Sequence, residues 1–274
     1  MSFFKNILSS FGKSALLLRA AEKGNAAAVQ RLLAAGVDVN TADEQKSTPL
    51  LRAAAQGHAA VVKLLLEHGA DVAHQCFYYG TKVLGLDALT LAATHGHIEC
   101  VKTLLEHGAK PIDRALETAL WNGHRDIALL LKEHGAHAQT VANRTNLMGA
   151  AEEGRADVVR LLLEFGVDAN AVDELGRTAL MEAAFAGDED IIRMLLDAGA
   201  AINAADEDGK TALMRAAELA EDGERFLAAV KLLLAAGADV YAANKEGKTA
   251  LDLARESGGA DCPIAHVLQA AGAR

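Results

Sequence analysis

Apolar and polar positions follow each other along the chain in a pattern that returns at a nearly fixed period. In most units two largely polar residues precede a Gly, a helix-length apolar stretch follows, and a second Gly stands twelve residues after the first. This step joins Gly24 to Gly36, Gly57 to Gly69, Gly96 to Gly108, Gly123 to Gly135, Gly154 to Gly166, and Gly187 to Gly199. Between the two glycines the apolar residues have helical spacing, as in Val61, Val62, Leu65 and Leu66. The pattern predicts one helix between the two glycines of each unit.

A second helix is predicted before the first Gly of each unit. Short blocks open it, namely Thr48-Pro49-Leu50, Thr145-Asn146-Leu147, Thr178-Ala179-Leu180, Thr211-Ala212-Leu213 and Thr249-Ala250-Leu251. A Thr hydroxyl is a favoured N-cap, and Pro49 suits the first turn of a helix. Weaker versions begin at Ala15, Asp87 and Arg114, so the sequence predicts eight helix pairs over residues 15–274. Polar turns that contain Gly, as in 173–176 and 206–209, separate the pairs.

One unit, STPLLRAAAQGHAAVVKLLLEHGADV at 47–72, closely resembles the ankyrin repeat. The resemblance extends over almost the whole chain, because all eight units share the spacing. It implies an all-α repeat solenoid of helix–turn–helix units with short β-hairpin fingers. It also implies that the fingers and the first helices line a concave groove that binds a partner protein.

The repeats are expected near 15–46, 47–86, 87–113, 114–143, 144–176, 177–209, 210–247 and 248–274. Residues 1–14 precede them and are predicted to form an amphipathic capping helix. Its apolar residues Phe3, Phe4, Ile7, Leu8 and Phe11 have helical spacing. Two other interpretations stay open, namely a disordered segment and a helix that binds a membrane surface or targets one. A secretory signal is not expected, since no uninterrupted apolar region follows the first charge.

Several departures from the family pattern carry expectations of their own. The family's fourth-position His is missing, which predicts that hydrogen bonds between repeats are unavailable and that packing compensates. Lys46 stands where a turn Gly is expected, so the first finger should bend differently. Six extra residues between Gly69 and Gly96 enlarge one finger, and the next one is truncated. Residues 220–225 should form a longer loop inside the seventh unit.

Composition narrows the class of protein. The net charge is −10 and the pI near 5.5, which argues against a nucleic-acid partner. The Cys residues at 76, 100 and 262 lack paired spacing, so neither a disulfide framework nor a zinc site is expected. This usage fits a reducing compartment and predicts a cytoplasmic protein, with a secreted effector as the alternative. No apolar run reaches the length of a membrane span, so integral membrane association is not expected.

No pattern of catalytic residues stands out. Most of the ten His occupy repeat positions, either after the first Gly or before the second. The pairs His95 with His97 and His134 with His137 lack a third metal ligand placed by the sequence. Phosphate-binding loops, dinucleotide fingerprints and hydrolase motifs are absent from the sequence. We therefore expect a monomeric interaction module, without cofactor, metal or enzymatic activity. A structural spacer is the alternative, and an enzyme a more remote one.

The two residues before each first Gly should lie on the groove. Trp121 and Asn122, Glu152 and Glu153, and Phe185 occupy such positions. An aromatic residue there is not required by the fold. Trp121 is either an exposed anchor for a partner or a filler of the space left by the truncated finger. The same two alternatives hold for Phe185, which can also pack on the neighbouring first helix.

Finger tips complete the predicted binding surface. The enlarged finger carries Tyr78 and Tyr79, which either form a recognition tip or fold back over the stack. The later fingers carry Glu174, Leu175, Glu207 and Asp208. Acids on the groove and the tips predict a partner segment that combines basic and hydrophobic residues. An adaptor, an inhibitor or immunity-type antidote, and an effector are all compatible roles.

Overall fold

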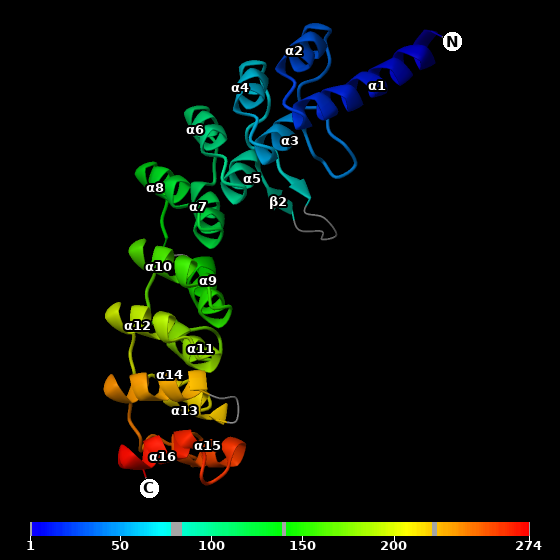
Figure 1. The fold of residues 1–274 in the computed structure, drawn as a ribbon. Coiled ribbons are helices and arrows are strands. Elements are labelled where there is room, and N and C mark those ends of the chain that lie inside the picture. The colour runs from blue at the N-terminus through cyan, green and yellow to red at the C-terminus, as the bar shows by residue number, and fades with distance from the viewer. Residues whose placement is uncertain (1, 78–83, 139–140, 221–223, 274) are drawn as a thin grey trace. The chain divides into compact units, whose positions relative to one another are not determined.

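The computed structural model describes residues 2–77, 84–138, 141–220 and 224–273, and the side chains of all of these except 2–11, 77, 84 and 141–145. In this part of the chain, sixteen α-helices follow one another in eight pairs (Figure 1). They are α1 (Ser2–Glu22), α2 (Ala26–Ala34), α3 (Pro49–Ala55), α4 (Ala59–Glu67), α5 (Ala88–Thr94), α6 (Ile98–Glu106), α7 (Ile112–Trp121), α8 (Arg125–Glu133), α9 (Val141–Glu152), α10 (Ala156–Glu164), α11 (Ala179–Ala186), α12 (Glu189–Asp197), α13 (Ala212–Ala217), α14 (Glu224–Ala235), α15 (Ala250–Gly258) and α16 (Pro263–Ala270). The predicted all-α repeat fold is confirmed.

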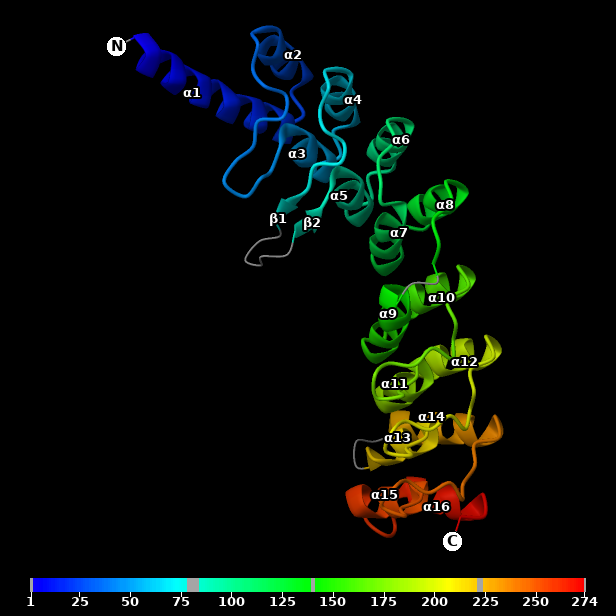
Figure 2. The ribbon, with the colours of Figure 1, turned by 180° about the vertical axis from the view of Figure 1, so that it is seen from behind.

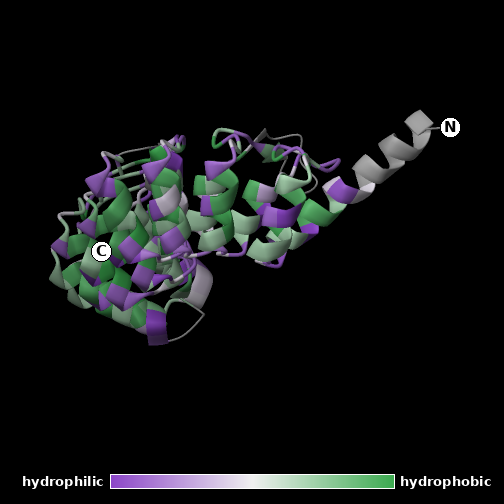
Figure 3. Ribbon diagram, turned by 90° about the horizontal axis from the view of Figure 1, so that it is seen from above, coloured by the Kyte–Doolittle hydropathy of each residue, from purple (hydrophilic) through white to green (hydrophobic). Residues whose placement is uncertain are grey.

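The chain divides into two compact units, Met1–His137 and Ala138–Arg274, each with four helix pairs. Within each unit the first helices of successive pairs pack on one another, and so do the second helices. Figure 2 shows the two rows of helices from behind. In Figure 3 hydrophobic residues run through the helices, whereas many hydrophilic residues lie in the connecting turns. Each repeat therefore buries its apolar faces on its neighbours as well as within its own pair.

The ends of the first helices follow from local chemistry. Thr48, Thr178, Thr211 and Thr249 each accept a hydrogen bond from the backbone N–H three residues on, so these predicted caps are confirmed. At Thr249 the bond is reciprocal, since Asp252 also accepts from the backbone N–H of Thr249. Asp87 caps α5 in the same way, with Oδ1 2.7 Å from the Thr90 nitrogen. These polar caps fix where five of the first helices begin.

Two first helices begin earlier than predicted. We expected Thr145 to cap the first helix of the fifth repeat. Instead α9 already begins at Val141, so Thr145 lies inside the helix. No Gly or Pro stands at 141–144 to prevent the extra turn. Similarly, α7 begins at Ile112 after Pro111, two residues before the expected start at Arg114.

The N-terminal segment also differs from the prediction. Residues 1–14 were expected to form a separate helix that caps the stack, with the first repeat beginning at Ala15. Instead α1 is a single helix of 21 residues that continues into the first repeat. Helix-favouring residues fill most of 13–21 without a Gly or Pro, and α1 continues through them into the first repeat. The N-terminal segment is thus helical as expected but shares one helix with the start of the first repeat, and its capping role stays a prediction.

The fingers are mostly tight turns rather than extended hairpins. The enlarged finger holds a two-stranded antiparallel sheet, β1 (Cys76–Phe77) and β2 (Leu84–Leu86). Single bridges join Val172 to Thr178 and Ala205 to Thr211. In four fingers one side chain organises the turn: Asp43, Asp173, Asp206 and Asn244 each accept hydrogen bonds from the N–H groups two and four residues ahead.

Lys46 does not change the bend of the first finger. Its φ is 60°, in the left-handed region that Gly176, Gly209 and Gly247 occupy at the same position. The hydrogen bonds of Asp43 match those of Asp173, including the bond between its backbone N–H and the carbonyl four residues on. The turn imposes its conformation on Lys46, and the expectation of a different bend is wrong.

Hydrogen bonds do connect neighbouring repeats, contrary to the expectation from the missing fourth-position His. Other histidines make them: Nε2 of His58, His97 and His124 lies 2.9–3.1 Å from the carbonyl oxygens of Glu22, Ala55 and Thr94, respectively, in the preceding repeat. Each ring sits against the first Gly of that repeat. A Cβ at Gly24 or Gly57 would lie only 2.6 Å from the next imidazole. These glycines are needed for close approach as well as for their positive φ.

A second set of contacts between repeats comes from Asn side chains in the long loops. Asn40 donates to the Gly69 carbonyl and accepts from the Asp71 N–H. Asn170 makes the corresponding pair of bonds with Gly199 and Ala201. In both compact units, the side-chain amide of an Asn thus binds one backbone donor and one backbone acceptor of the next repeat.

The structure describes only the ends of the loop that was predicted inside the seventh repeat. Residues 221–223 lie outside the described residues, and Glu224 and Arg225 already belong to α14. That helix has 12 residues, compared with 9 in α12. Part of the predicted loop is therefore an extra helical turn.

The strained turn at Lys46 gives a first prediction. Replacing Lys46 with Gly should raise the free energy of unfolding by about 0.5–1 kcal/mol, because Gly adopts positive φ without the Cβ clash. Denaturant unfolding measures this change. The matched reverse variant is Gly247→Lys, at a site where a Cβ meets no atom within 4 Å. It should lose stability, and an equal effect of both variants would contradict the explanation.

Uneven stability gives a second prediction. The third and fourth repeats combine an enlarged finger with a truncated one, and α7 has no side-chain cap, whereas Thr178 caps α11. Because each repeat contacts only its neighbours, local defects are not averaged over the array. Amide hydrogen exchange should therefore be faster in 109–125 than in 178–200. The reverse order would show that these defects do not control local opening.

Candidate interaction surface

The residues that precede the first Gly lie at the C-terminal ends of the first helices. None of them is buried. Exposed positions are Glu22, Lys23, Gln56, His95, Asn122, Glu152, Glu153, Phe185 and Glu256, and half-buried ones are Ala55, Thr94, Trp121, Ala186, Glu218, Leu219 and Ser257. These positions are open to contact, in contrast to the buried Ala residues one turn earlier.

Trp121 is the last residue of α7 in the first unit. Its side chain is half-buried, so it is neither a fully packed filler nor a fully exposed anchor. The adjacent Asn122 is exposed and donates from Nδ2 to the Thr118 carbonyl at 2.7 Å. Asn122 thus caps the end of α7, directly after Trp121.

Phe185, in the second compact unit, is the other aromatic residue among those that precede a first Gly. It is the penultimate residue of α11, and 39% of its surface is exposed. Glu152 and Glu153, at the end of α9 one repeat earlier, are exposed as well, and Glu153 lies 3.9 Å from Arg155. The structure therefore places Phe185 and the two Glu residues in one unit and Trp121 in the other.

The predicted finger-tip residues belong to neighbouring fingers of the second unit. Glu174, Leu175, Glu207 and Asp208 are all exposed, with Leu175 at 53%. Backbone bonds tie these tips together, because Glu207 donates to the Leu175 carbonyl at 2.8 Å. Lys245 of the following finger donates in turn to the Asp208 carbonyl at 2.8 Å. The backbones of consecutive tips are thereby held at a fixed spacing.

Ion pairs reduce the acidity predicted for the groove. Lys210 binds Glu218 at 2.6 Å, and Lys248 binds Glu256 at 2.8 Å. Glu22 is bound by Arg52. Lys210 and Lys248, each directly before a Thr cap, and Arg52 of α3 thus offset three of the acidic residues at the helix ends. The acidic character of the second unit lies more with the tips and with the Glu152–Glu153 pair.

A partly buried charge network underlies the fingers of the second unit. Glu182 on α11 is only 6% exposed and lies 3.0 Å from Arg177, which also binds Asp173 at 2.7 Å. Burial raises the pKa of Glu182, an effect that Arg177 and Arg215 oppose. Arg215 binds Asp206 at 3.2 Å. The network fixes the fingers against the first helices that carry the candidate surface.

The sequence analysis missed a hollow in the first unit. It has a volume of about 500 Å³ and lies between the first finger, the enlarged finger and helices α3 and α5. Groove residues Ala55, Gln56 and His95 line one side. Arg52 lies in the hollow and bridges Asp43 at 2.6 Å and Glu22 at 2.8 Å. The signal in the sequence was Arg52 itself, a charged residue inside an otherwise apolar first helix.

The enlarged finger forms one wall of this hollow. Cys76 of β1 lines it, and its thiol donates to the Leu86 carbonyl across the hairpin. Burial raises the pKa of Cys76, so the thiol is poorly suited to nucleophilic chemistry. Tyr78 and Tyr79 lie outside the described residues, and both alternatives for them stay predictions.

Histidine and cysteine side chains serve packing and hydrogen bonding in the described residues. The rings of His95 and His97 stack with centroids 6.0 Å apart, and each uses one ring nitrogen on a backbone carbonyl. Burial raises the pKa of Cys100 to about 11. Within the described ranges, no group of three His, Cys, Asp or Glu residues has the geometry of a metal site. Nor does any helix in these ranges have the length and apolar character of a membrane span.

The buried Glu182 gives a third prediction. Since its folded-state pKa is raised, the protonated form favours folding, and stability is lost as pH rises from the usual Glu range, near 4.3, through the raised value. Glu182→Gln keeps an oxygen for Arg177 and stays neutral. The free energy of unfolding of this variant relative to wild type should therefore increase from about pH 4 to pH 7.

Urea unfolding at a series of pH values measures this dependence. Glu207→Gln, at an exposed finger tip, corrects for the change in net charge and should show a smaller dependence. A constant difference between Glu182→Gln and wild type at every pH would contradict the raised pKa.

Comparison with known families agrees with the geometry of the helix pairs. Residues 3–76, 75–142, 117–206 and 147–244 each match the family model described as ankyrin repeats in three copies. Among curated proteins the search gives no match. All the family matches are to ankyrin repeats, which generally form protein–protein interaction modules. With its matches running from residue 3 to residue 244, the chain belongs to the ankyrin repeat family.

Proposed function

We propose that the chain is a non-catalytic interaction module that holds a segment of a partner protein against the ends of its first helices and the tips of its fingers. The exposure of Phe185 carries this proposal. A large aromatic side chain stands at a helix end where the fold does not need one, and 39% of it is open to solvent. Aromatic residues are enriched among the side chains that dominate binding energy.

The surroundings of Phe185 favour a partner segment with hydrophobic and basic residues. Leu175, on the finger that precedes α11, adds exposed apolar area. Glu152, Glu153, Glu174, Glu207 and Asp208 add negative charge, and the backbone bonds between the tips limit the entropy lost on binding. Trp121, Asn122 and the hollow around Arg52 give the first unit a contact surface of its own. Tyr78 and Tyr79 are candidates for a further contact.

We further propose that the protein acts in the cytoplasm as a monomer, in an adaptor, inhibitor or immunity-type role, with secretion as an effector as the alternative. The acidic balance argues against a nucleic-acid partner. A purely structural spacer would need no exposed aromatic at the groove position, so Phe185 favours the binding module. Enzymatic activity of the pure protein would overturn the proposal.

Photo-crosslinking identifies the partner and tests the surface. A photoreactive phenylalanine analogue is placed at position 185 and, as the matched control, at Tyr241, an aromatic residue in a long loop that is 63% exposed. The proposal expects a protein captured at 185 and not at 241. The same captured proteins at both positions would mean that the crosslinks report exposure alone.

Affinity measurements with the captured partner give the fourth prediction. Phe185→Ala and Trp121→Ala should each weaken binding by at least ~2 kcal/mol, because each removes an aromatic side chain that a bound partner would bury. Tyr241→Ala should bind like wild type. Glu152→Lys combined with Glu153→Lys should mainly slow association, and added salt should have a similar effect. If these variants fold and bind normally, the helix ends are not the site, and the finger with Tyr78 and Tyr79 becomes the leading candidate.

A further inference from the structure

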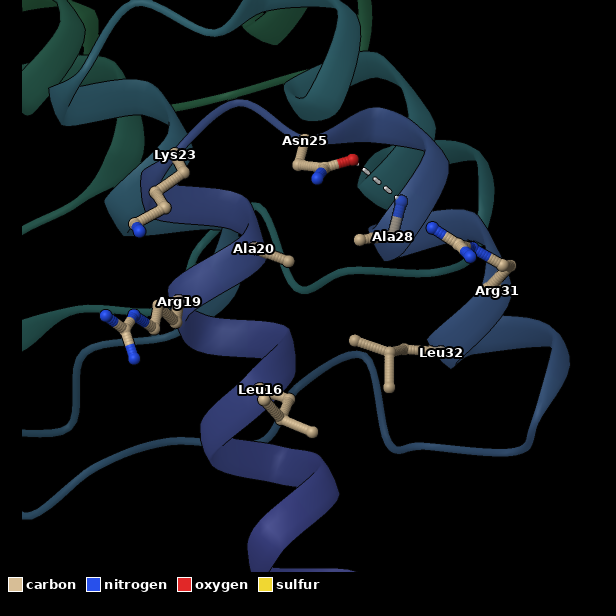
Figure 4. Close-up of a pocket in the computed structure, with 8 residues that line it drawn as sticks. All are labelled: Leu16, Arg19, Ala20, Lys23, Asn25, Ala28, Arg31 and Leu32. Carbon is tan, nitrogen blue, oxygen red and sulfur yellow. Dashed lines mark hydrogen bonds between the residues drawn. The ribbon is translucent and has the colours of Figure 1, made fainter.

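The first repeat has an open outer face. Helices α1 and α2 pack on α3 and α4, and the first repeat also bears a hollow of about 420 Å³ lined by residues of α1, α2 and the turn between them. Figure 4 shows Leu16 and Leu32 pointing toward each other across it, with Ala20 and Ala28 beside them. Leu16 is 56% exposed. In a repeat array, an apolar face of this kind is what the repeat on that side would normally cover.

Positive charge surrounds this apolar face. Arg19, Lys23 and Arg31 line the hollow, and all three are exposed. Among the described residues no ion pair engages any of them. The first 31 residues hold five Lys or Arg and a single acid, Glu22, whereas the whole chain has a net charge of −10. Glu22 is bound by Arg52 of the second repeat, so it does not neutralise this face.

The same helix extends the surface beyond the repeat. The first helix of the second repeat, α3, has 7 residues, whereas α1 has 21 and runs out past α2 and α3 (Figures 1 and 2). The sequence of the extension places apolar residues at 3, 4, 7, 8 and 11, with Lys5 and Lys13 among them. A helix with this spacing is amphipathic, and Lys rather than acid supplies its charge.

We propose that α1 and the outer face of α2 bind the surface of an anionic lipid bilayer. An interfacial helix buries its apolar side at the boundary of headgroups and acyl chains, while its cations bind the anionic headgroups. Leu16 and Leu32 supply apolar contact in the first repeat, and Arg19, Lys23 and Arg31 supply charge around them. The acidic remainder of the chain is repelled from the same surface, which orients the molecule with its first repeat toward the lipid.

Charge argues against a second copy of the chain as the occupant. A two-fold dimer through this face would bring Arg19, Lys23 and Arg31 against the same three residues. Such like-charge contact is unfavourable at an interface. The proposal is independent of partner binding by Phe185 and Trp121, because those residues lie outside α1 and α2.

Vesicle co-sedimentation of the full chain tests the proposal. The probes are vesicles of phosphatidylcholine alone and vesicles with about 30% phosphatidylserine, an anionic surface of the kind that attracts basic segments. Wild type should bind the phosphatidylserine vesicles, bind phosphatidylcholine far less, and dissociate at high salt. Arg19→Gln with Lys23→Gln and Arg31→Gln should reduce binding roughly 100-fold, about fivefold for each cation.

A matched variant separates the local surface from the net charge. Lys63→Gln with Arg160→Gln and Lys231→Gln removes three exposed cations from second helices and should bind like wild type. Leu16→Ser should weaken binding, and Leu129→Ser, at an exposed Leu on α8, should not. Circular dichroism confirms that each variant is folded.

Three results would overturn the proposal. The first is no binding of wild type to phosphatidylserine vesicles, and the second is equal loss in the two triple variants. The third is self-association of wild type that Leu16→Ser abolishes, which would make a second copy the occupant. Light scattering at several protein concentrations detects this last outcome.

Discussion

Close approach between the first helices of neighbouring repeats is the constraint on which the structure depends. At that contact the chain places pairs of Ala, and Ala53, Ala54, Ala92, Ala93, Ala183, Ala184, Ala216 and Ala217 have no exposed surface. A larger side chain in these positions would have to displace the neighbouring helix, because protein interiors are close-packed. The low content of aromatic residues follows from this geometry. Large side chains are left for positions outside the contact, which is why an exposed Phe185 is informative.

Polar groups at the same contact are satisfied by the backbone of the next repeat. Imidazoles connect successive repeats in the first unit, and Asn side chains bridge long loops in both units. Each bond ends on a carbonyl that a helix end or a loop would otherwise leave without a protein partner. The ion pairs of Arg177 with Asp173 and Glu182 likewise join a finger to the first helix beneath it. Polar residues therefore fix the register of repeats that apolar packing holds together.

The helix pairs were predictable because glycine spacing and Thr caps are local signals. Thr48, Thr178, Thr211 and Thr249 needed only their own helix to act as caps. Thr145 does not mark the start of α9, because no Gly or Pro at 141–144 stops the helix and a cap residue does not prevent extension upstream. The continuous α1 was missed for the same reason. Helix propensity indicates where a helix is possible, whereas its start depends on what the preceding residues do.

Features that involve two repeats were harder to predict. The roles of His58 and His97 require knowing that the preceding Gly leaves room for a ring, which one repeat alone does not show. The conformation of Lys46 follows from Asp43 and the turn around it, and the residue type alone suggested otherwise. The hollow around Arg52 needs two fingers and two helices together. The exposure of Phe185 followed from its place in the repeat, whereas the half-burial of Trp121 depends on how its neighbours pack.

The contacts between successive repeats at the first Gly are of more than one kind. Gly24 lies against His58, Gly57 against His97, and Gly96 against His124, so these three contacts have the same geometry. At Gly187 the neighbours are Arg225 and Phe226. If a repeat among the first four were duplicated or deleted, the new neighbours would again place a Gly against a His. The same change across Gly187 would bring an imidazole against a site shaped for Arg225 and Phe226, so the two kinds of contact are not interchangeable.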